Sequence, residues 1–69
     1  MLSARNQFGG EVKSIITDKV MAEVTVSAGG LDFVALISNA SAKNMGLKAG
    51  DEVAVVVKAT EVMIAKGKL

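Results

Sequence analysis

The sequence predicts an all-β fold, a small antiparallel barrel of five strands with one short helix. Several stretches alternate apolar and polar residues, which is the period of a half-buried strand. Glycine pairs and short polar segments separate these stretches, and such spacing is typical of strands joined by tight turns. Only one segment carries helix-capping signals. A chain of 69 residues suits one domain, which we expect to span residues 1–69.

The first two strands are expected at residues 7–16 and 20–28. Gly9 and Gly10 interrupt the first strand, and glycines inside a strand indicate a bulge or the close approach of another backbone. The second strand alternates most clearly, with every second residue from Val20 to Ala28 apolar. We expect that set, Val20 included, to face the core.

The third strand is expected at residues 31–38. Gly29 and Gly30 precede it and predict a two-residue hairpin, because glycine tolerates the positive φ angles of such turns. Val34 and Leu36 make the second face of this strand apolar as well. An antiparallel sheet is apolar on both faces where a neighbour covers it, so this strand favours packing against another molecule.

One short helix and two more strands complete the predicted fold. Either Ser38 or Asn39 can cap the helix, and Gly46 is placed to end it in the left-handed conformation. Leu47 should then pack back into the core. A strand follows at residues 52–58, with alternate valines on one face. The last strand begins at residue 60 or 61 and ends at residue 65.

Composition favours self-association. With 51% hydrophobic residues, the chain is too apolar to be disordered. A domain of this length buries only about 60% of its unfolded surface. Cysteine is absent, so no disulfide or thiolate metal site can stabilise the fold. We therefore expect a homo-oligomer, with a marginally stable monomer as the alternative.

Charge and aromatic content argue against nucleic acid or a membrane as partner. The net charge is +1, whereas a nucleic-acid footprint needs a basic patch. Phe8 and Phe33 are the only aromatic residues, too few for a base-stacking barrel, which remains a third and disfavoured alternative. No apolar stretch approaches the roughly 20 residues of a membrane span. No secretory signal is recognisable, so we expect a cytoplasmic protein.

Catalysis is not expected. Without histidine and cysteine, the commonest general base and the best nucleophile are missing. The seven carboxylates form no recognisable paired or clustered motif. We therefore predict no enzyme activity, no directly coordinated metal cation and no organic cofactor.

Anion binding suits the residues that precede the first strand, Ser-Ala-Arg-Asn-Gln at positions 3–7. Arg5 is the only arginine of the chain, and its planar guanidinium donates several N–H groups to an oxyanion at once. Ser3 adds a hydroxyl donor, and backbone N–H groups add more. The alternative is an exposed, frayed terminus.

Three segments together resemble the molbindins, the Mop-type molybdate-binding proteins whose unit also occurs as the TOBE-type domain. They are the opening Ser-Ala-Arg-Asn-Gln, the turn Gly-Leu-Lys-Ala-Gly-Asp at 46–51, and Lys-Ala-Thr-Glu-Val-Met-Ile at 58–64. The resemblance spans nearly the whole chain. It implies an OB-like barrel, a homohexamer built as a trimer of dimers, and molybdate or tungstate as the bound ligand.

The resemblance also implies a site between two subunits. Its residues would be Ser3, Ala4 and Arg5 from one chain with Lys58 and Ala59 from its partner. Some family members have serine where this chain has Ala59, so here only a backbone N–H can serve at that position. The neighbouring Thr60 hydroxyl is expected on the opposite strand face. The alternative for Lys58 is a solvated strand-end lysine.

A second class of family site lies around three-fold contacts and uses mainly backbone donors. Lys19 and Val20 are the candidates for it, and their alternative is a turn lysine followed by a core valine. The leading hypothesis is thus intracellular binding, storage and homeostasis of molybdate or tungstate. The competing hypothesis is a TOBE-like protein–protein or regulatory module that binds the anion weakly or not at all.

Overall fold

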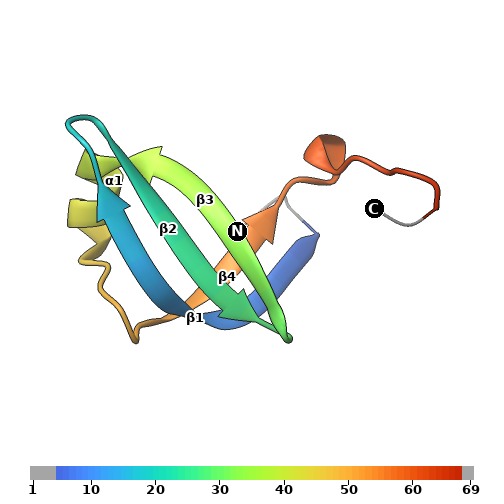
Figure 1. Ribbon diagram of the computed structural model, residues 1–69, viewed down its shortest axis with the longest axis horizontal. Coiled ribbons are helices and arrows are strands. Elements are labelled where there is room, and N and C mark those ends of the chain that lie inside the picture. The colour runs from blue at the N-terminus through green and yellow to red at the C-terminus, as the bar shows by residue number, and fades with distance from the viewer. Residues whose placement is uncertain (1–4, 68–69) are drawn as a thin grey trace.

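The computed structural model describes residues 5–67 and consists of one antiparallel sheet with a short helix at one end (Figure 1). Four strands are hydrogen-bonded in the order β3-β2-β1-β4. The elements are β1 (Asn6–Thr17), β2 (Met21–Ala28), β3 (Leu31–Ser38), α1 (Asn39–Met45), β4 (Glu52–Val57) and the 3₁₀ turn η1 (Ala59–Glu61). The structure is therefore mostly β with one short helix, as the sequence predicts.

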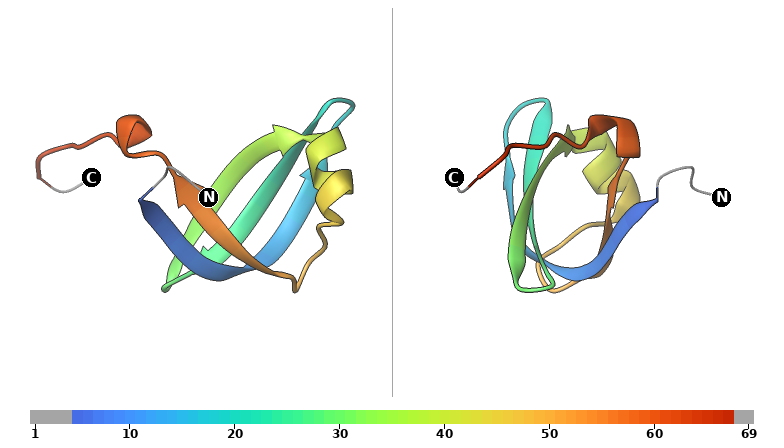
Figure 2. Two further views of the ribbon diagram at one scale, coloured as in Figure 1. Left: turned by 180° about the vertical axis from the view of Figure 1, so that it is seen from behind. Right: turned by 90° about the vertical axis from the view of Figure 1, so that its right-hand side faces the viewer.

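Strand β1 is shared between two neighbours. Its first half pairs with β4, from Asn6 opposite Val57 to Glu11 opposite Glu52. Its second half pairs with β2, beginning with Glu11 opposite Ser27. The register with β2 shifts between Val12 and Ser14, and β1 bends along its length so that the sheet curls into an open barrel (Figure 2). The free edges of this sheet belong to β3 and β4.

The bend depends on Gly10. A Cβ atom built at Gly10 would lie 2.4 Å from the Ser27 carbonyl oxygen and 2.7 Å from the Ala28 Cβ. Real side chains do not approach this closely, so only glycine lets β2 cross here. Gly9 has nothing within 4 Å of the same position. The predicted close backbone approach is therefore confirmed at Gly10 and not at Gly9.

The core follows the alternation of β2, with one exception. The buried apolar residues are Val12, Ala22, Val24, Val26, Ala28 and Ala42. Val20 was expected among them, but it is 70% exposed. The strand begins at Met21, and Val20 lies in the preceding turn, where its carbonyl oxygen accepts the Asn39 N–H at 2.8 Å. The turn directs its side chain to solvent, so the prediction of a core valine is wrong.

Local signals in the hairpin and the helix are confirmed. Gly29 and Gly30 have φ angles of 58° and 78°, as the predicted turn requires. Ser38 is the N-cap of α1, and its side chain accepts the backbone N–H three residues on at 3.1 Å. Gly46 ends the helix with φ of 64°, and Leu47 packs against the core cluster.

The predicted fifth strand is not formed within residues 5–67. Thr60 and Glu61 belong to η1, which the Glu61 N–H closes onto the Lys58 carbonyl oxygen at 2.9 Å. Residues 62–67 then run away from the sheet without regular structure (Figures 1 and 2). A strand needs a neighbour to pair with, and this segment has none in a single chain. The sheet has four strands, and the barrel stays open.

Substitution of the two β1 glycines tests the bend. Gly10→Ala should lower the free energy of unfolding by about 1–3 kcal/mol, because the new Cβ overlaps the β2 backbone. Gly9→Ala should leave it unchanged or raise it by roughly 0.5–1 kcal/mol, because alanine restricts the unfolded chain. Urea unfolding at one protein concentration measures both. Equal destabilisation by both substitutions would contradict the close approach at Gly10.

Candidate functional site

The β1–β4 pairing brings Arg5 and Lys58 to the same end of the sheet. Asn6 and Val57 are the last paired residues, and the Asn6 Nδ2 donates to the Val57 carbonyl oxygen at 3.3 Å. Continued by one residue, this register sets Arg5 opposite Lys58. Residues directly opposite in antiparallel strands share a face, with Cα atoms about 4.5–5.5 Å apart. We call this pair the cationic end; both residues are exposed.

No acidic partner neutralises the cationic end within residues 5–67. The ion pair found in that part of the chain joins Lys13 Nζ to Asp32 Oδ2 at 2.9 Å, on other strands. Like charges on opposite strand positions destabilise the pairing. A bound anion would relieve this repulsion, and its charge-assisted hydrogen bonds would be stronger than neutral ones.

Ala59 extends the candidate site through its backbone. It is the first residue of η1, and the first N–H groups of such a turn have no acceptor inside the turn. Thr60 was expected on the opposite face of a strand, but no strand forms there, and Thr60 is an exposed residue of η1. Ser3 and Ala4, the other two predicted residues, lie outside the described part of the chain.

Lys19 and Val20 lie at the other end of β1, in the turn to β2. The Lys19 N–H donates to Asp18 Oδ1 at 2.6 Å, and the Asp18 N–H donates to the Met21 carbonyl oxygen at 2.8 Å. The Asp18 carboxylate therefore occupies one of the predicted backbone donors and adds negative charge beside it. The structure does not bring this turn together with the cationic end.

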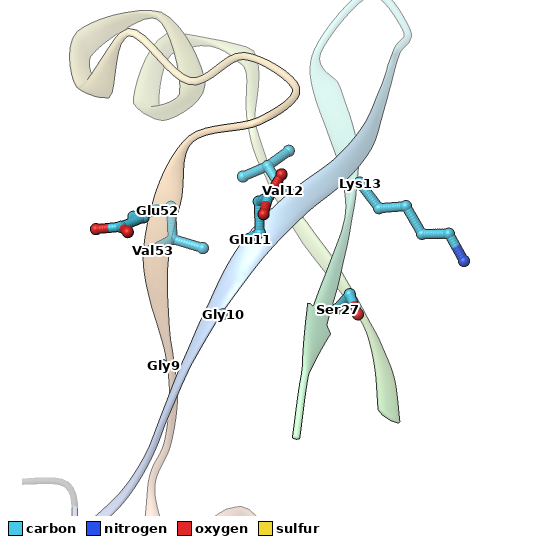
Figure 3. A pocket seen from close by; sticks show the side chains of 8 residues that line it. All are labelled: Gly9, Gly10, Glu11, Val12, Lys13, Ser27, Glu52 and Val53. Carbon is cyan, nitrogen blue, oxygen red and sulfur yellow. The ribbon is translucent and has the colours of Figure 1, made fainter. Parts of the chain in front are cut away.

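A hollow of about 660 Å³ beside β1 and β4 has the opposite electrostatic character (Figure 3). Glu11 and Glu52, which are register partners, both line it. Lys13 extends away from these carboxylates (Figure 3). Its ammonium forms an ion pair with Asp32 at 2.9 Å. Two carboxylates repel an oxyanion, so electrostatics favours the cationic end over this hollow.

Sequence reasoning missed two elements of this geometry. Asn6 was part of the singled-out segment, yet its role in holding the register to Val57 was not assigned. The Glu11 and Glu52 pair was also not predicted, because they are far apart in the sequence and only the register joins them. An amide beside an arginine at the start of a strand was the one available signal.

The described residues were also searched for a metal site and for a membrane-spanning helix. Residues 5–67 contain no group of three or more histidines, cysteines or carboxylates placed to hold a metal ion. Over the same residues, no helix is both long and apolar enough to cross a membrane.

Comparison with known proteins finds a family model and several relatives that match most of the chain. The TOBE domain family model matches residues 2–64. Molybdenum-pterin-binding protein 1 of Clostridium pasteurianum is 42% identical over 67 residues, which cover 91% of this chain and 94% of that protein.

Solved structures show the same similarity. A molybdate-binding protein from Sporomusa ovata superposes with a TM-score of 0.92 at 36% identity, covering 96% of this chain and 98% of that one. The cytoplasmic molybdate-binding protein ModG, crystallised with molybdate bound, gives a TM-score of 0.81 at 40% identity. That match covers 86% of this chain and 43% of the ModG chain.

Repulsion at the cationic end predicts an unusual stability effect. In oxyanion-free buffer of low ionic strength, Arg5→Gln should raise the free energy of unfolding by a few tenths of a kcal/mol, because it removes a like-charge pair. Added salt should reduce the gain. Urea unfolding measures the effect. Lys13→Gln is the control, and it should have the opposite sign because it breaks the pair with Asp32. Destabilisation by Arg5→Gln would mean that Arg5 has a structural partner.

Proposed function

The chain belongs to the TOBE domain family and is related to the Mop proteins, and from this membership we propose that it binds molybdate at the cationic end. The observation that carries the proposal is the β1–β4 register, whose last pair is Asn6 and Val57, so that Arg5 and Lys58 follow at the same end of the sheet with no acidic partner found in residues 5–67. Molybdate is a tetrahedral dianion, and convergent N–H and O–H donors can hold it without a covalent ligand.

Each proposed residue has a distinct role at the anion. Arg5 and Lys58 supply positive charge, and the planar guanidinium also supplies paired donors. Ser3 supplies a hydroxyl, and Ala4, Arg5 and Ala59 supply backbone N–H groups. Arg5 and Lys58 lie at the same end of the sheet in each chain, and we propose that the site forms between two subunits, with Ser3, Ala4 and Arg5 from one chain and Lys58 and Ala59 from the other. Excluding water there would strengthen every hydrogen bond to the anion.

We further propose a homo-oligomer, a hexamer arranged as a trimer of dimers, whose subunit is the single domain of residues 1–69. It would act in the cytoplasm as a store or buffer of molybdate or tungstate and would have no enzyme activity. Lys19 and Val20 remain the proposed residues of a second site at three-fold contacts. The cytoplasmic description of ModG and the molybdate named for the structural relatives support this assignment.

Selectivity is the demanding part of this function. Sulfate is also a tetrahedral dianion with the same donor requirements, so discrimination must come from the size of the cavity. The names of the sequence relatives also mention a pterin. Our proposal is binding of the inorganic anion alone, and the probe is therefore sodium molybdate without any pterin.

Ala59 keeps a second candidate function open. It removes a hydroxyl that some family members have at this position, so the chain could be an interaction module that binds the anion weakly or not at all. A stoichiometric protein partner in a pull-down, together with no molybdate binding, would favour that function over the first.

Removing both cations tests the site. Arg5→Gln with Lys58→Gln should weaken molybdate binding at least a hundredfold, because each charged hydrogen bond contributes roughly 1.5–3 kcal/mol and each 1.4 kcal/mol is tenfold. Isothermal titration of anion-stripped protein measures the affinity. The control, Lys43→Gln with Lys48→Gln, removes the same net charge away from the site. Unchanged affinity in the Arg5 and Lys58 variant would refute the assignment.

Restoring a hydroxyl tests the role of position 59. Ala59→Ser should tighten molybdate binding up to about tenfold, because one additional neutral hydrogen bond contributes roughly 0.5–1.5 kcal/mol. The same titration serves, with Thr60→Val showing whether the neighbouring hydroxyl already participates. Weaker binding by Ala59→Ser would contradict a donor position next to Lys58.

A further inference from the structure

The turn between β1 and β2 is held against the start of α1 (Figure 1). The Asn39 N–H donates to the Val20 carbonyl oxygen at 2.8 Å, and the Asn39 Nδ2 donates to the Asp18 carbonyl oxygen. The Asp18 N–H in turn donates to the Met21 carbonyl oxygen at 2.8 Å. The backbone of residue 18 is therefore fixed on both sides of its Cα atom, by β2 and by α1.

The side chain of Asp18 binds the backbone of the next residue. Asp18 Oδ1 accepts the Lys19 N–H, with 2.6 Å between the oxygen and the nitrogen. An ionised carboxylate is a stronger acceptor than a neutral group. Among residues 5–67, the Val20 N–H has no acceptor. Of the two backbone donors at the proposed second site, one is therefore free and the other is occupied by the protein itself.

No described neighbour neutralises the charge of Asp18. The carboxylate is exposed, and the ion pair found within residues 5–67 joins Lys13 to Asp32 instead. A hollow of about 390 Å³ lies beside the turn, and Asp18 and Lys43 both line it without forming an ion pair. There is thus room for an anion beside the turn, but a fixed negative charge already lies there.

We propose that Asp18 is an internal competitor of the anion at the second site. An oxyanion that reaches the Lys19 N–H must displace the Asp18 carboxylate, and the displaced carboxylate then repels the oxyanion. The cationic end has the opposite character, because Arg5 and Lys58 attract an anion. Molybdate therefore binds first at the cationic end, and the second site fills only at higher molybdate concentrations.

This inference deepens the proposed function, and it rests on Lys19 and Val20 being the residues of the second site. Asp18 sets the affinity of that site and leaves the affinity of the cationic end as it is. Two sites of different affinity buffer the free anion over a wider range of concentrations than two equal sites. The competition thus suits a protein that stores and releases the anion.

Substitution of Asp18 tests the competition. Asp18→Asn has the same shape and can still accept the Lys19 N–H, so this variant removes the charge and keeps the turn. The matched control is Asp51→Asn. Asp51 Oδ2 also accepts a backbone N–H, that of Lys48 at 3.0 Å, and Asp51 lies at neither proposed site. The two variants have the same net charge.

Backbone amide NMR of the anion-stripped protein, titrated with sodium molybdate in low-sulfate buffer, measures the two sites separately. The Ala59 amide reports the cationic end, and the Lys19 and Val20 amides report the turn. In the wild type, Ala59 should reach its midpoint at a lower molybdate concentration than the turn. In Asp18→Asn, the midpoint of the turn should fall about tenfold, because the charged competitor is gone. The Ala59 midpoint should stay the same, and Asp51→Asn should change neither midpoint.

An unchanged or higher midpoint of the Lys19 and Val20 amides in Asp18→Asn would overturn the proposal, and so would an equal fall in Asp51→Asn. A wild-type midpoint of the turn equal to or below that of Ala59 would also overturn it. No response of the turn in any variant would do the same, while a response of Ala59 would leave the cationic end intact. A stronger response of the turn in Asp18→Asn, with none at Ala59, would support the competition and refute the site at the cationic end.

Discussion

The sharing of β1 between two strands is the constraint on which the rest of the structure depends. Its first half pairs with β4 and its second half with β2, and Gly10 makes room for the crossing at the bend. The same pairing has an electrostatic consequence along β1 and β4. Arg5 and Lys58 follow one end of the β1–β4 pairing, and Glu11 and Glu52 form the last pair at its other end. An oxyanion is attracted to the first end and repelled from the second.

The single chain exposes two features that the proposed homo-oligomer could cover. The barrel is open between β3 and β4, and the cationic end is exposed to water. Lys58 is followed by η1 and then by the exposed side chains of Val62, Met63 and Ile64, so in the proposed homo-oligomer a subunit that covered the cationic end would lie beside exposed apolar surface. Stability and function would then be linked, because a ligand that binds only the assembled form stabilises that form by mass action.

Much of the fold was predictable because its signals are local. The alternation of Ala22, Val24, Val26 and Ala28 identifies a strand face, and Ser38 and Gly46 identify the ends of the helix. The opposition of Arg5 and Lys58 was not predictable from spacing, because the register joins residues far apart in the chain. The error at residues 60–65 has a similar physical cause. An apolar pattern indicates that a segment favours burial, but it does not show whether a neighbouring strand is available to pair with it.

Calorimetric titration of the wild-type protein is the most direct test of anion binding at the cationic end. The protein is stripped of anions in low-sulfate buffer and titrated separately with molybdate and with sulfate. Saturable binding of molybdate in a fixed ratio to the chain, with much weaker binding of sulfate, is the result that we predict. No binding of either anion would contradict the account. The chain would then be better explained as an interaction module whose anion site is lost at Ala59.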